Sequence, residues 1–159
     1  MKAVEIEISI DAPLELVWDT LLRTEEYPLW NPFIQKVECA SASLVVGSII
    51  DLHIHWPSGR KEIAREQICT IERPGEKDDT ALWEYTYEGI LARLYLLQAK
   101  RVQRLSKGQH GGTIYYSADF FKGIGRFLVP FRDVKEGFLL QAEGLKKHCE
   151  RKSKELPLP

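Results

Sequence analysis

Aromatic and acid–base side chains alternate with other residues along two runs in the middle of the chain. Trp83, Tyr85 and Tyr87 form the first run, and Tyr115 and Asp119 belong to the second. A period of two predicts β-strands on which these side chains share one face. Buried tyrosine hydroxyls need polar partners, and a buried carboxyl gains a raised pKa. Both a ligand-cavity wall and a packed core fit this pattern, and Asp119 faces inward or outward depending on the strand register.

Two histidines, His53 and His55, have the H-x-H spacing that places both rings on one face of a strand, as some zinc sites require. The apolar residues Leu52, Ile54 and Trp56 occupy the opposite face, so the histidines are expected to face solvent. No third ligand comes with its own motif, and we predict no metal site. G-x-S-x-G and G-x-x-x-x-G-K motifs are absent from the sequence, and we predict no cofactor.

Composition places the chain among single-domain globular proteins. Its 159 residues are 44% hydrophobic, enough to form a core without metals or disulfides. A net charge of −1 argues against a nucleic-acid partner. No apolar run reaches the length of a membrane span, and the chain starts with a strand pattern instead of a signal sequence, so we expect a cytoplasmic protein. We interpret its three cysteines as buried free thiols.

The elements that must position these residues begin with a strand over 4–10. Asp11 is then suited to cap a helix with Pro13 in its first turn, and Thr24 to cap a short second helix. Prolines 28 and 32 are expected to stop that helix. The segment 27–33, YPLWNPF, predicts a rigid aromatic corner before a strand over 34–39.

Turn signals divide the rest of the chain into strands at about 48–56, 60–72, 81–89, 93–105 and 112–121. Short links between them predict an antiparallel meander. Apolar residues at spacings of three and four then predict a helix from Gly125 to about Lys152, with Pro130 in its first turn or kinking it. Residues 1–153 should form one domain, and 154–159 a disordered tail.

This order of elements resembles the START-related, Bet v 1-like superfamily of helix-grip proteins, of the polyketide cyclase/dehydrase and lipid-transport type. The resemblance covers nearly the whole chain and rests on the long C-terminal helix and on Ala12, Pro13, Val17, Trp18, Tyr27, Pro28, Trp30, Asn31, Pro32, Phe33, Gly47, Pro57, Gly59, Trp83, Gly112, Thr113, Phe121 and Gly123. It implies an α+β helix-grip fold: two short helices after the first strand, and a curved antiparallel sheet of about seven strands wrapped around the C-terminal helix.

The resemblance also implies a cavity between the sheet and that helix. We therefore predict binding of a small hydrophobic or amphipathic ligand (lipid, isoprenoid, polyketide or quinone type), without catalysis, by a monomer or weak homodimer. The expected lining residues come from the apolar faces, the aromatic corner and the C-terminal helix: Trp30, Phe33, Leu52, Ile54, Trp83, Tyr85, Tyr87, Tyr95, Leu97, Tyr115, Asp119, Phe131, Val134 and Phe138.

An alternative function is that of a polyketide cyclase/aromatase or dehydratase in which Asp119 and Tyr85 or Tyr115 move protons. Ser117 stands where the family often has a histidine, so Asp119 lacks an imidazole partner. This departure favours the non-catalytic hypothesis over the enzymatic one. A protein-interaction module is a third class, and the charged surface shows no dominant patch to favour it.

Overall fold

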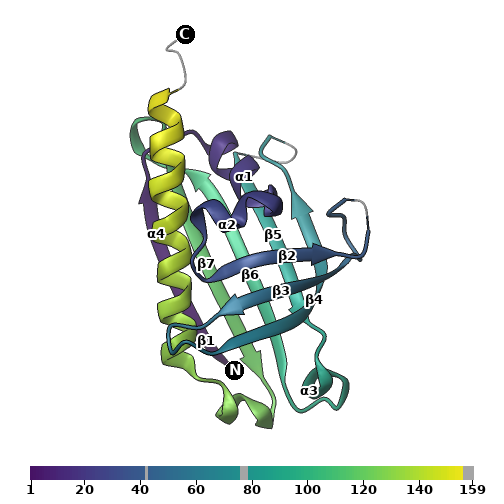
Figure 1. The fold of residues 1–159 in the computed structure, drawn as a ribbon. Coiled ribbons are helices and arrows are strands. Elements are labelled where there is room, and N and C mark those ends of the chain that lie inside the picture. The colour runs from purple at the N-terminus through teal and green to yellow at the C-terminus, as the bar shows by residue number, and fades with distance from the viewer. Residues whose placement is uncertain (42, 76–78, 156–159) are drawn as a thin grey trace.

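A computed structural model describes residues 1–41, 43–75 and 79–155, and within these residues seven strands form one antiparallel sheet (Figure 1). The sheet order is β1-β7-β6-β5-β4-β3-β2. The strand bounds are β1 Lys2–Ile10, β2 Ile34–Cys39, β3 Ile49–His55, β4 Lys61–Glu72, β5 Thr80–Tyr87, β6 Gln98–Lys107 and β7 Thr113–Lys122.

Helices lie in the connections and at the C-terminal end of the described chain. They are α1 Leu14–Leu22, η1 Thr24–Glu26, α2 Tyr27–Trp30, α3 Ile90–Arg93, η2 Gln109–Gly111, η3 Ile124–Leu128 and α4 Phe131–Glu155. The 25-residue α4 runs along the strongly curved sheet, and β2, β3 and β4 cross the view of Figure 1 while β1 and β7 follow the helix. The predicted helix-grip fold class is confirmed.

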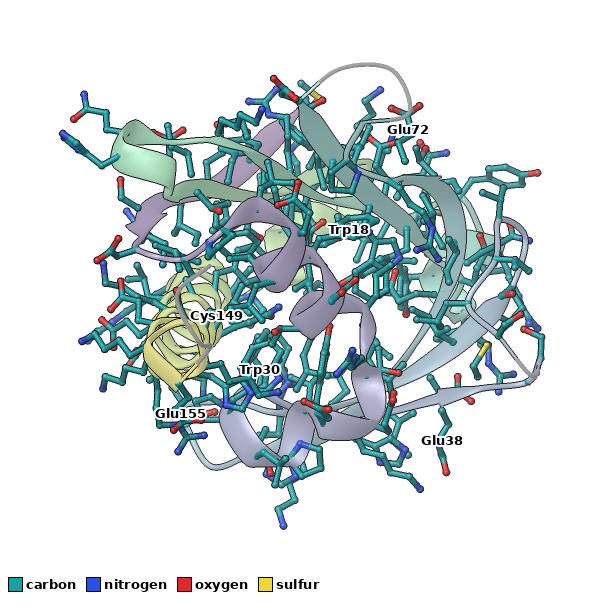
Figure 2. The ribbon with its side chains drawn as sticks, turned by 90° about the horizontal axis from the view of Figure 1, so that it is seen from above. Trp18, Trp30, Glu38, Glu72, Cys149 and Glu155 are labelled. Atoms are coloured by element: carbon teal, nitrogen blue, oxygen red, sulfur yellow. The ribbon has the colours of Figure 1, made fainter. Side chains whose placement is uncertain are left out.

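Alternating sequence patterns place the core as expected. Val4, Ile6 and Ile10 of β1 are buried, as are Leu52 and Ile54 of β3. The N-terminal helices close one end of this core, where Trp18 and Trp30 lie inside and Glu38 at the outer edge (Figure 2). Apolar side chains that share one face of each strand thus pack against the helical layer and are buried away from solvent.

Two glycines let the N-terminal corner approach α4 closely. A Cβ at Gly144 would overlap the Trp30 carbonyl oxygen, and one at Gly137 would overlap the Phe33 ring. The corner before β2 therefore rests directly on the helix backbone, with no side chain between them. Asn31 fixes the corner itself, because its Oδ1 accepts hydrogen bonds from the backbone N–H groups of Phe33 and Ile34, at 3.0 and 2.9 Å.

The helix starts differ from the capping predictions. Pro13 occupies the N-cap of α1 with no side-chain cap, and the backbone N–H of Asp11 instead donates to Glu150 Oε1 on α4 at 2.9 Å. Thr24 begins a 3₁₀ turn without a side-chain cap, and Pro28 lies in the first turn of α2 instead of stopping a helix. Asp11 is therefore bonded to α4 through its backbone and does not cap α1.

The strand expected at 93–105 is present but starts five residues later, and the expected helix start at 125 is wrong. Gly89 leads into the short helix α3, and β6 starts only at Gln98, after Tyr95 adopts a positive φ of 56°. Residues 124–128 form a 3₁₀ turn, and α4 begins at Phe131 directly after Pro130, whose carbonyl accepts from Val134 N at 3.0 Å. Proline lacks the N–H that would extend a helix backward through it.

The C-terminal helix extends beyond its predicted end, and two of the three thiols are less buried than predicted. Lys154 and Glu155, assigned to the tail by the sequence, belong to α4, and 156–159 lie outside the described residues. All three cysteines are free, but Cys149 alone is fully buried, because Cys39 is half-buried and Cys69 is exposed. Among the described helices, none combines the length and apolar character needed to cross a membrane.

Candidate functional site: a cavity between sheet and helix

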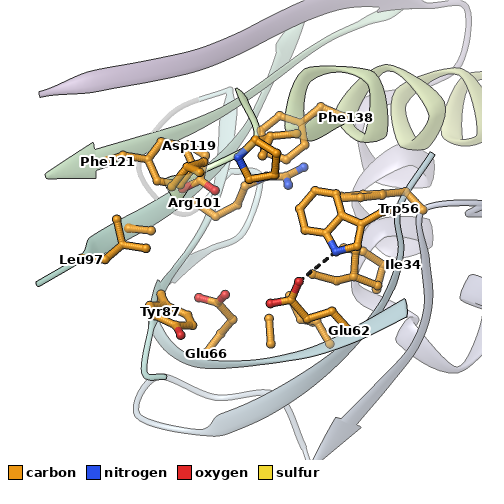
Figure 3. A pocket seen from close by; sticks show the side chains of 18 of the residues that line it. Ile34, Trp56, Glu62, Glu66, Tyr87, Leu97, Arg101, Asp119, Phe121 and Phe138 are labelled. Atoms are coloured by element: carbon orange, nitrogen blue, oxygen red, sulfur yellow. Dashed lines mark hydrogen bonds between the residues drawn. The ribbon is translucent and has the colours of Figure 1, made fainter. Parts of the chain in front are cut away.

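A cavity of about 310 Å³ lies between the curved sheet and the N-terminal half of α4 (Figure 3). Strands β2 to β7 supply its floor and sides, and Val129, Pro130, Val134 and Phe138 form its roof. Most lining side chains are apolar, so the cavity suits the burial of an apolar ligand surface.

Nine of the fourteen residues expected to line a cavity do lie on its wall: Phe33, Leu52, Ile54, Tyr85, Tyr87, Leu97, Asp119, Val134 and Phe138. Strand alternation located most of them. Asp119, whose facing the sequence left open, is on the inner face.

The other five expected residues lie elsewhere. Trp83 and Tyr115 are fully buried core residues, and the Tyr115 hydroxyl donates to Gln103 Oε1 at 2.6 Å. Trp30 packs edge-on against Tyr27, and Phe131 against Phe121. Tyr95 is 82% exposed, because the turn after α3 takes it out of the sheet.

The sequence reasoning missed the cavity's buried cation, Arg101 of β6. Its side chain is only 6% exposed, and its guanidinium lies 3.4 Å from the centroid of the Phe138 ring. Nε donates to Ser117 Oγ at 3.0 Å, and one terminal nitrogen donates to Gln141 Oε1 at 3.3 Å. The guanidinium is therefore held by both β7 and α4 while it remains part of the cavity wall.

Two carboxyl groups face the same cavity from opposite sides of Arg101. Asp119 is its cross-strand partner on β7, and Glu66 projects from β4. Burial raises the pKa of Asp119 to about 7, although Arg101 acts to lower it. Burial and the Asp119 charge raise the pKa of Glu66 well above its usual range. Asp119 Oδ1 is buried and accepts no hydrogen bond from the described residues, so its hydrogen-bonding capacity is unfilled.

Polar contacts also lie at one side of the cavity, around Glu62. Trp56 Nε1 donates to Glu62 Oε2 at 2.9 Å, and Arg60 pairs with the same carboxyl at 3.1 Å. Figure 3 shows the Trp56–Glu62 bond at one side of the cavity. The exposed lining residues Arg60, Glu62, Leu128 and Pro130 place the mouth between the β3–β4 hairpin and the link into α4.

Solved structures resemble the whole chain. Major latex-like protein 151 from Panax ginseng has a TM-score of 0.70 at 16% identity, over 93% of this chain and 97% of that one. A point mutant of Thalictrum flavum norcoclaurine synthase, in complex with a transition-state analogue, has a TM-score of 0.68 at 16% identity, over 96% of both chains. The protein NE0264 from Nitrosomonas europaea has a TM-score of 0.68 at 17% identity, over 97% of both chains.

The chain has the helix-grip fold of Bet v 1-like proteins. The fold-level resemblance expected from the sequence is confirmed. No protein-family model matches the sequence, and a search of curated proteins gives no match. Likeness at this level of identity describes architecture, so function must be argued from the cavity itself.

Within this helix-grip cavity, the available proton donors and acceptors lie close to Arg101. The Tyr85 hydroxyl accepts from Gln103 Nε2 at 3.3 Å, which leaves its own hydrogen free to be donated. Burial raises the pKa of Tyr85, so the phenol stays protonated. A donor hydroxyl, a carboxyl titrating near neutrality and a fixed guanidinium together can bind and orient one polar group of a ligand.

The residues that sequence reasoning missed carried weak signals. Glu66 alternates with Ala64 and Ile68 on one face of β4, so a charge beside two apolar residues was visible but unused. Arg101 had no such signal, because charged and polar residues fall on both faces around it in β6. The predicted strand also began five residues too early.

The two histidines of β3 were considered as metal ligands. His53 bonds with Glu38, and no cluster of potential metal ligands occurs in the described residues.

Proposed function

We propose that this protein binds a small amphipathic molecule in the helix-grip cavity, with the ligand's polar group beside Arg101 and Asp119. The observation that carries the proposal is an apolar cavity of about 310 Å³ with an unpartnered buried carboxyl oxygen in its wall. The free energy of binding comes from burial of apolar ligand surface, at about 25 cal/mol per Å². The polar group fixes the ligand's orientation.

Volume and polarity narrow the expected ligand. Typical small-molecule cavities range from roughly 300 to 1,000 Å³, so this one is at the lower end. That size favours a compact ring system of the polyketide or quinone type over a long acyl or isoprenoid chain. A hydroxyl or carbonyl on the ring would meet Asp119, Tyr85 or the guanidinium.

Adjacent residues of β4 provide a matched test, because Ala64 lines the cavity while Ile63 is exposed on the opposite face. Trp56 is in the wall, so saturable quenching of tryptophan fluorescence by a panel of apolar phenols and quinones should report binding. Ala64→Phe should weaken that binding at least about tenfold by filling the cavity, and Ile63→Phe should not. Absence of saturable quenching by the whole panel, or equal losses in the two variants, would refute the proposal.

A second candidate is proton-transfer catalysis on a polyketide-like chain, by cyclisation or dehydration. It is favoured by Asp119, whose pKa of about 7 suits an acid or a base at neutral pH, and by the free hydrogen of Tyr85. Tyr115 is less suitable, because its hydroxyl is committed to Gln103.

Mass spectrometry of incubated ligands separates the two functions. Catalysis predicts an altered product whose formation is lost in Asp119→Asn and Tyr85→Phe, while Tyr115→Phe retains it. If every bound ligand is recovered unchanged, the protein is a binder.

A further inference from the structure

Exposed apolar side chains gather at one end of the molecule. Of thirteen large apolar residues exposed in the described part of the chain, seven fall within residues 88–98 and 122–132, two stretches of eleven residues. We call this surface the apolar tip, and it consists of Ile90, Leu94, Tyr95, Leu96, Ile124, Phe127 and Leu128. Monomeric proteins rarely expose so many neighbouring apolar side chains without a binding role.

The two stretches of the apolar tip form one continuous surface. Gly125 N donates to the Leu96 carbonyl oxygen at 2.7 Å, which joins the η3 turn to the segment after α3. Gly123, with a φ of 93°, lies so close to the same carbonyl that a Cβ would overlap it. Figure 1 shows both segments at the same end of the molecule, away from the C-terminal end of α4.

This surface is basic as well as apolar. Its two stretches contain Arg93, Lys122, Arg126 and Arg132 against a single acidic residue, Glu88, in a chain whose net charge is −1. The Arg126 guanidinium lies 4.5 Å from the centroid of the exposed Phe127 ring, so charge and apolar surface are presented together. Basic residues interleaved with aromatic and aliphatic ones are typical of surfaces that enter the interface of an anionic bilayer.

We propose that the apolar tip docks this protein reversibly on anionic lipid bilayers. Phe127, Leu128 and the residues around Tyr95 enter the headgroup region, and Arg93, Lys122 and Arg126 contact lipid phosphates and carboxylates. A second copy of the chain is a poorer occupant, because two tips of equal positive charge repel each other. Leu128 of the tip and the neighbouring Leu91 of α3 also belong to the cavity wall, so, if the proposed function holds, docking brings the cavity mouth close to the lipid.

Vesicle flotation tests the docking directly. The wild-type protein should float with phosphatidylcholine/phosphatidylserine vesicles and much less with phosphatidylcholine alone, and added salt should weaken the binding. Phe127→Glu should lower the partition coefficient by at least about tenfold, since it replaces an inserted ring by a repelled charge. Tyr95→Asn, which tolerates the positive φ at that position, should reduce binding without backbone strain.

Leu29→Glu is the matched control, because Leu29 is 73% exposed on α2 and Phe127 is 75% exposed on the tip. This control should float like the wild type, as should the cavity variant Ala64→Phe, whose defect concerns the ligand. No flotation of the wild type with anionic vesicles would overturn the proposal. So would an equal loss in Leu29→Glu, or a dimer in light scattering that Phe127→Glu dissociates.

Discussion

Arg101 and Asp119 lie directly opposite each other on β6 and β7, and both line the cavity. The Arg101 guanidinium nevertheless donates to Ser117 and Gln141. Asp119 Oδ1 accepts no hydrogen bond from the described residues. The guanidinium is held in place by neutral partners. Asp119 is left as the polar group that a ligand can engage.

Asp119 should make the stability of the protein fall as the pH rises from about 4 to about 7. Its pKa is about 7 in the folded state and near 3.8 in an unfolded chain, so the folded state binds more protons in this window. The shift corresponds to roughly 4 kcal/mol at most, and we expect about 2 to 4 kcal/mol in practice. Urea unfolding of wild type and Asp119→Asn across this range measures it.

Asn cannot ionise, so the stability difference between the Asn variant and wild type should grow in favour of the variant as the pH rises from about 4 to about 7 and level off above that. The stability gained by acids with lowered pKa values, such as Asp51 and Glu26, is lost at lower pH and is common to both proteins. An unchanged difference from pH 4 to 8 would show that Asp119 titrates normally.

Replacing Arg101 by Met should raise the pKa of Asp119 above 7, because the nearest positive charge is lost. It should also destabilise the fold by about 2 to 4 kcal/mol, since buried groups on Ser117 and Gln141 lose a charged donor. Carbon-13 NMR titration of the Asp119 carboxyl measures the pKa. Arg104→Met is the control, because Arg104 is exposed on the other face of β6 over Tyr116; a similar effect there would contradict the assignment.

Gly144→Ala should destabilise the protein although alanine favours helices. The new Cβ would overlap the Trp30 carbonyl oxygen, and a backbone atom cannot rotate away. Overpacking costs about 1 to 3 kcal/mol, against a helix-propensity gain of at most about 1 kcal/mol. Chemical denaturation gives the net value, and Glu143→Ala on the exposed face should be nearly neutral. A stabilised Gly144→Ala variant would mean that the corner is not held against the helix.

The three thiols should react with a disulfide reagent at very different rates. Burial raises the pKa of both thiols, to about 11 for Cys149, but Cys69 is exposed to the reagent and Cys149 is buried. Because the thiolate is the reactive form, Cys149 should react at least about a hundredfold more slowly in the native protein and quickly after unfolding. Cys69→Ser should abolish the fast phase. Equal rates for all thiols would indicate that α4 opens readily.

The sequence predicted those buried faces of strands and helices that follow from a regular spacing of apolar residues. Alternation in β1 and β3 identified their buried faces, and the stripe at Val134 and Phe138 identified the inner face of α4. Asp119 was identified because it alternates with aromatic residues, but Glu66 and Arg101 were missed, since a charged residue is not expected on the inner face of a strand without such a pattern. Tyr95 was placed in a strand since nothing in its neighbours marks the turn that exposes it.

Helix α4 is held unequally along its length. In its C-terminal half, Gly144 contacts the Trp30 carbonyl oxygen of the corner before β2, and Lys152 Nζ donates to Glu26 Oε2 at 2.9 Å. Its N-terminal half begins after Pro130 and supplies Val134 and Phe138 to the cavity wall. The first turns of α4 therefore border the cavity directly, whereas the contacts of its C-terminal half with Trp30 and Glu26 lie away from the cavity wall, so the two halves of one helix serve ligand space and fold stability separately.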